Sequence, residues 1–162
     1  MISFNAREVY EMAEQIERNG ASFYRKAAGA APDESVRKFL LDLAAMEDDH
    51  ERTFAGMKAH LGEAEALDTV YDPHGEGAQY LHAMVEGKVF DFTSDPSDRL
   101  TGVESTEQVL RIAIELEKDS ILYYLTMKKM VLDASSQDRI DEIIEQEMGH
   151  IAMLTRRVAG TN

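Results

Sequence analysis

Six side chains in this sequence could together hold metal ions, and they form two sets that repeat one hundred residues apart. Each set has one glutamate and, thirty residues later, a Glu-x-x-His motif. Residues three apart on a helix share a face about one turn apart, so the Glu and His of each motif can reach a common point. The chain has no cysteine, so a metal must bind to oxygen and nitrogen ligands. The candidate ligands are Glu17, Glu47, His50, Glu117, Glu147 and His150.

The charges of these groups predict how many ions the site holds. Four carboxylates cannot all ionise in an apolar interior, because desolvation and mutual repulsion both oppose it. Two divalent cations balance the four negative charges, and neutral imidazoles complete the set. We therefore expect two ions whose binding depends strongly on pH and stabilises the fold. Iron and manganese both accept carboxylate and imidazole ligands, so the residues alone fit either metal.

Four further residues repeat at the same offset beside the lone glutamates. Gly20 and Ser120 lie one turn beyond them, and small side chains there leave room for an oxidant next to the metals. Tyr24 and Tyr124 lie two turns beyond, where a hydroxyl could hydrogen-bond to a ligand. The alternative is that the small residues serve close helix packing and that both tyrosines are ordinary core.

These residues require four long helices to position them. Cap and stop signals place the helices at about 5–29, 33–61, 105–133 and 136–158. Each has an apolar heptad stripe that ionisable groups interrupt at mid-height. Short links make helices one and two, and helices three and four, antiparallel hairpins, and the repeat predicts a pseudo-twofold axis between them.

A crossover of about forty residues, 62–104, separates the two hairpins. It contains Gly and Pro turn signals, and residues 78–86 within it have the spacing of a short helix. The predicted fold is all-α: an antiparallel four-helix bundle with a long crossover between helices two and three, in one domain over 1–162.

Composition excludes several classes of function. A formal net charge of −14 argues against nucleic-acid binding, which depends on Lys and Arg. No apolar run approaches the ~20 residues that span a bilayer, and no basic start followed by an apolar run marks a signal peptide. We therefore expect a cytoplasmic protein that binds neither nucleic acid nor membrane.

Four segments in order, ERNGASFY (17–24), EDDH (47–50), EKDSILYY (117–124) and EMGH (147–150), resemble the di-iron domain of the rubrerythrin family. The resemblance covers nearly the whole chain. It implies a ferritin-like fold, a homodimer, two iron ions per chain and the reduction of hydrogen peroxide at a di-iron centre.

The chain departs from that family in two respects. Rubrerythrins carry a rubredoxin-like domain with four cysteines, so here the electrons must come from a separate donor such as a rubredoxin. The family often has an extra glutamate three residues before the third-helix ligand, where this chain has Ile114. Glu14, three before Glu17, is the equivalent residue of helix one, and it could be an extra carboxylate or an ordinary solvated residue.

Other functions remain open at this stage. The same ligands could serve ferritin-like iron oxidation and sequestration, although a symmetric two-histidine site with a long crossover is less typical of a cage-forming subunit. An oxidase or hydroxylase that uses oxygen on an organic substrate, and a bundle without chemistry, are further alternatives.

Overall fold

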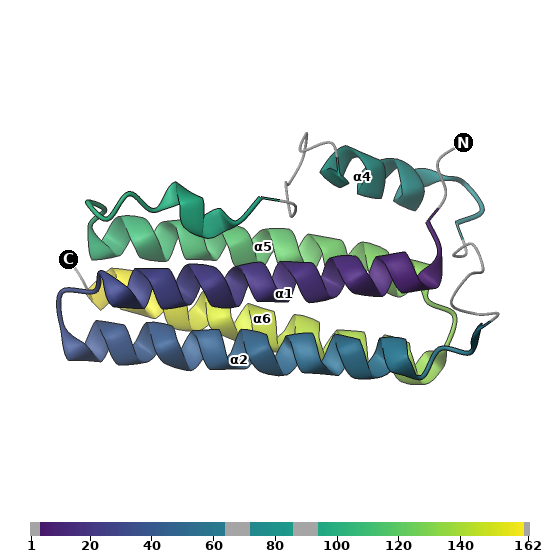
Figure 1. The fold of residues 1–162 in the computed structure, drawn as a ribbon, viewed down its shortest axis with the longest axis horizontal. Coiled ribbons are helices and arrows are strands. Elements are labelled where there is room, and N and C mark those ends of the chain that lie inside the picture. Colours follow the sequence, from purple (N-terminus) through teal and green to yellow (C-terminus); the bar gives the residue numbers. More distant parts are fainter. Residues whose placement is uncertain (1–3, 64–71, 86–93, 161–162) are drawn as a thin grey trace.

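The predicted all-α bundle is confirmed by a computed structural model, which describes residues 4–63, 72–85 and 94–160. Four long helices lie side by side, and a short helix lies against one end of the bundle (Figure 1). The elements are α1 (Ala6–Gly29), α2 (Glu34–Ala59), α4 (Glu76–Val85), the 3₁₀ helix η1 (Pro96–Arg99), α5 (Thr106–Met130) and α6 (Ala134–Gly160).

The helix starts follow the capping chemistry of the sequence. Asn5 caps α1 and Ser105 caps α5, each in a reciprocal capping box with the residue three positions on. Asp33 caps α2 by accepting from the Val36 amide. Each cap satisfies amides that the first helical turn leaves without a partner.

The link between α5 and α6 differs from the predicted bounds. We expected α5 to reach residue 133 and the last helix to start at 136, but α5 ends at Met130 and α6 begins at Ala134. Val131 has an extended backbone, with φ −87° and ψ 125°, and this ends α5. Asp133 starts α6, because its carboxylate accepts from the Ser136 amide at 2.7 Å and its carbonyl accepts from the Gln137 amide at 3.0 Å. Asp133 thus acts as an N-cap and cannot extend α5.

The crossover connects two helices that run in the same direction. α2 ends at the end of the bundle where α4 lies, and α5 starts at the opposite end, so the chain must travel the length of the bundle (Figure 1). The predicted short helix is present as α4, and residue 86 lies outside the described ranges. The 3₁₀ helix η1, which packs on α1, was not predicted from the sequence.

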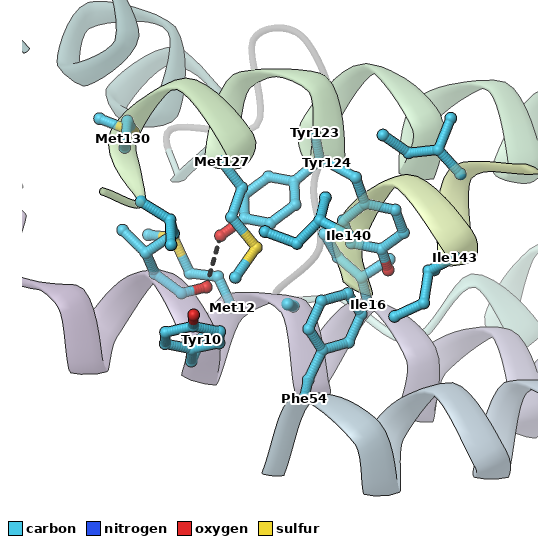
Figure 2. Packing of buried hydrophobic residues seen from close by; sticks show 14 of the residues in the cluster. Tyr10, Met12, Ile16, Phe54, Tyr123, Tyr124, Met127, Met130, Ile140 and Ile143 are labelled. Atoms are coloured by element: carbon cyan, nitrogen blue, oxygen red, sulfur yellow. Dashed lines mark hydrogen bonds between the residues drawn. The ribbon is translucent and has the colours of Figure 1, made fainter. Parts of the chain in front are cut away.

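Two apolar clusters fill the bundle core. The first, near the α4 end, includes Phe54, Met127 and Tyr123, whose hydroxyl donates to the Val9 carbonyl at 2.6 Å (Figure 2). The second, toward the other end, includes Phe23, Leu40 and Leu110 among other buried residues. The polar groups of the predicted metal site lie at the mid-height of the helices, between these clusters.

None of the helices in the described ranges combines the length and the apolar character that crossing a membrane requires.

Candidate metal centre

The four long helices bring the six predicted ligands together in the core. Each hairpin supplies a glutamate from its first helix and a Glu-x-x-His pair from its second. These six residues are at most 3% exposed, so the charges of their carboxylates are not part of the solvated surface. The ligands are Glu17 on α1, Glu47 and His50 on α2, Glu117 on α5, and Glu147 and His150 on α6.

The six residues form two overlapping groups, each able to hold one metal ion. Glu17 and His50 complete the first group, and Glu117 and His150 complete the second. Glu47 and Glu147 belong to both, and within each group the ligand atoms lie within 4.8 Å of one another. The geometry is that of two adjacent sites with two shared carboxylates.

The orientation of the histidines fits metal ions better than hydrogen bonds. His50 Nδ1 lies 2.9 Å from a Glu147 oxygen, and His150 Nδ1 lies 2.8 Å from the other oxygen of Glu147 and 3.2 Å from Glu47. Among the residues that the structure describes, neither of these Nδ1 atoms and neither oxygen of Glu147 has a hydrogen-bond partner. Buried polar atoms without partners are costly, so converging ones indicate that a cation completes the site.

The shifts of the pKa values agree with a site made for cations. Burial and the nearby Glu147 raise the pKa of Glu17 to about 7, and burial with Glu47 raises that of Glu117 well above its usual range. Burial opposes a charge on His50, but Glu147 and Glu17 together raise its pKa to about 11. Without metal, protons therefore occupy the site in place of cations.

The two tyrosines connect the hairpins. The Tyr24 hydroxyl donates to Glu117 and the Tyr124 hydroxyl donates to Glu17, so each tyrosine binds the terminal glutamate of the other hairpin. The sequence predicted that each tyrosine could hydrogen-bond to a ligand, but not that the ligand would come from the other hairpin. Burial raises the pKa of both hydroxyls, so they stay protonated and act as donors.

Gly20 has a role in addition to the one that its size suggested. A Cβ atom there would lie 2.9 Å from Glu47 Oε2, so the glycine makes room for a shared carboxylate as well as for a small molecule. A cavity of about 20 Å³ does adjoin it, lined by Glu47, Glu117, Ser120 and Pro96 of η1 among others. That volume is about what one water molecule needs.

Glu14 is not brought into either ligand group. It is buried on α1, but its carboxylate lies 2.7 Å from Lys58 Nζ of α2. Its role as an extra carboxylate at the site stays a prediction.

The structure adds one polar contact that sequence reasoning missed. The Oε1 atom of Gln146, an exposed residue of α6, lies 2.8 Å from His50 Nε2, the ring nitrogen that faces away from the carboxylates. The sequence signal for this contact was that Gln146 lies on the same helix as the predicted ligand His150, four residues before it.

Comparison with known proteins supports the fold. A crystal structure from Thermotoga maritima, of a proposed ferritin-like diiron-carboxylate protein, matches 100% of this chain and 99% of its own, with a TM-score of 0.73 and 22% identity. The similarity shows a ferritin-like fold. No family model matches the chain, and neither does any curated protein.

Proposed function

We propose that this chain is a rubrerythrin-like di-iron oxidoreductase that reduces hydrogen peroxide. The observation that carries the proposal is the pair of adjacent ligand groups that share Glu47 and Glu147. The Thermotoga structure, described as that of a proposed diiron-carboxylate protein, supports the same metal. Manganese would fit the ligands too, so metal content is part of the test.

The chemistry requires two electrons and two protons for each peroxide. Two ferrous ions on the six ligands would supply both electrons, and peroxide and two protons would become two waters. The chain's own residues hold the ions, exclude bulk water by burial, and fix Glu117 and Glu17 through the hydroxyls of Tyr24 and Tyr124. The cavity beside Gly20 and Ser120 is where we expect the oxidant to enter.

The proposal includes two partners. The sequence contains no cysteine and hence no rubredoxin-like iron site of its own, so a separate donor such as a rubredoxin would return the electrons. We also propose that the protein works as a homodimer, as the resemblance to rubrerythrins implies.

An anaerobic iron experiment tests the activity. Protein loaded with ferrous iron is mixed with peroxide or with oxygen, and iron oxidation is followed by absorbance. We expect two irons oxidised per chain, faster with peroxide, and no such reaction in Glu47→Ala. Continued oxidation of a large iron excess would instead support sequestration, and unchanged peroxide turnover in Glu47→Ala would refute the proposal.

A further inference from the structure

We infer that the two metal positions are inequivalent, with Gln146 acting as a positioning residue for His50 so that the Glu17–His50 position binds metal more tightly. The inference rests on the metal centre of the proposed function. It concerns binding, and it holds whatever oxidant the protein uses.

The contact has the geometry that a metal-binding histidine needs on its outer side. Nδ1 of His50 faces the carboxylates of Glu147 and Glu17, at 2.9 and 3.5 Å, and Nε2 faces Gln146 Oε1 at 2.8 Å. Since a carbonyl oxygen only accepts, the Nε2 atom of His50 must carry the proton. The lone pair of a neutral imidazole is then on Nδ1, where the carboxylates converge.

The pseudo-twofold repeat shows how the two metal positions differ. Gln146 lies four residues before His150 and reaches across to His50, so its counterpart for His150 lies four residues before His50. That residue is Met46. A thioether sulfur is only a weak acceptor, and within the described ranges no hydrogen bond is formed by His150 Nε2.

The rest of the two positions is closely matched. Each has one terminal glutamate with a tyrosine donor, and both share Glu47 and Glu147. The rings of His50 and His150 stack with centroids 5.6 Å apart and an angle of 19° between planes. Two polar contacts differ: His50 has the outer hydrogen bond to Gln146, and His150 Nδ1 has a Glu47 oxygen at 3.2 Å that His50 Nδ1 lacks among the described contacts. The outer hydrogen bond is the difference that acts on a ring from the side away from the carboxylates. Such bonds to a ligating histidine typically change metal affinity by ~10- to 100-fold.

Zinc titration of the full chain tests the inference without redox chemistry. Calorimetry with a competing chelator gives the number and affinity of the binding steps, and NMR of the histidine ring nitrogens shows which ring binds first. We expect two steps, with His50 Nδ1 shifting in the first. Gln146→Met should weaken that step by ~10- to 100-fold, and Gln146→Glu, which keeps an acceptor, should not.

Because the two hairpins repeat, exchanging the residues at positions 46 and 146 gives the most direct test. Met46→Gln combined with Gln146→Met should make His150 the first ring to bind. Both side chains are exposed, so the fold should tolerate the exchange. Glu142→Met is the matched control, because Glu142 is an exposed residue one turn before Gln146 on α6. It should leave both zinc-binding steps unchanged.

The outcomes separate this inference from the proposed function. Two zinc ions that bind with a single affinity, or a first step unaffected by Gln146→Met, would overturn the inference and leave the metal centre in place. Failure to bind any zinc or iron would overturn both.

Discussion

At the scale of single residues, the metal site requires that position 20 have no side chain. Its Cβ would lie 2.9 Å from Glu47 Oε2, a distance that real contacts do not show, so Gly20→Ala must displace a shared carboxylate. We expect zinc or iron affinity to fall at least tenfold, because Glu47 serves both metal positions. Chelator competition measures the loss.

Gly149→Ala is the matched control for that change. Gly149 lies between Glu147 and His150 on α6, yet no atom of the described part of the chain lies within 4 Å of an added Cβ. Alanine there should stabilise the helix by about 0.5–1 kcal/mol and leave metal affinity unchanged. Equal losses in both variants would mean that Gly20 matters for the helix and not for the carboxylate.

The ionisable residues make the stability of the metal-free protein depend on pH. Glu17 binds its proton more tightly when folded, with a pKa of about 7 against an ordinary value of 4.5. His50 does so too, at about 11 against 6.5. A raised folded pKa gives stability that is complete below the unfolded value and lost as pH rises through the folded one.

We therefore expect the Tm of the metal-free protein to fall as pH rises from about 5 to 9. Glu17 contributes at the lower end of that range and His50 at the upper end. Zinc affinity should rise over the same range, because the cation displaces those protons. Calorimetry with chelator present measures the Tm, and Glu17→Gln should flatten its acidic part. A Tm that rises with pH would contradict the assignment.

At the scale of elements, η1 holds the crossover against the side of α1 that bears the site. Ser22 Oγ donates to Asp95 at 2.9 Å, and Lys26 Nζ donates to the Ser97 carbonyl at 2.7 Å. Asp95 also caps η1 through the Ser97 amide. These bonds keep Pro96 over the cavity beside Glu47 and Glu117.

Asp95→Ala should release this cover. We expect a loss of about 1–2 kcal/mol in the free energy of unfolding, from one cap and one hydrogen bond. Chelators should then remove metal several-fold faster, because Pro96 lies over the cavity less of the time. Stopped-flow with a coloured chelator measures the rate. Asp98→Ala, which removes the same charge from an exposed position of η1, should change neither quantity.

The elements also show what a sequence can predict here and why the rest escapes it. Local chemistry determines helix caps such as Asn5 and the periodicity that turns Glu47 and His50 inward, so both could be predicted. η1 depends on contacts with α1 more than seventy residues away, which periodicity cannot reveal. Gln146 lies on an exposed part of α6, where an ordinary solvated glutamine is the usual expectation.

At the scale of the whole molecule, the polar centre divides the core in two. One apolar cluster lies on the side of Phe54 and Met127, and the other lies on the side of Leu40 and Leu110. The clusters should keep the helices folded without metal, since each joins residues from both hairpins. The metal centre between the clusters should then destabilise the bundle when no metal is bound and stabilise it when both ions are bound.

Metal should therefore raise the Tm without creating the fold. Two ions, each at 100 times its Kd, would add roughly 5 kcal/mol, or on the order of 10–20 °C for a chain of this size. Scanning calorimetry with zinc and with chelator measures the shift, and far-UV circular dichroism should show helices in both states. Glu47→Gln removes a shared carboxylate charge and should lose most of the shift while staying helical. Loss of helix on chelation would mean that the apolar clusters cannot hold the bundle alone, and the metal would then be part of folding itself.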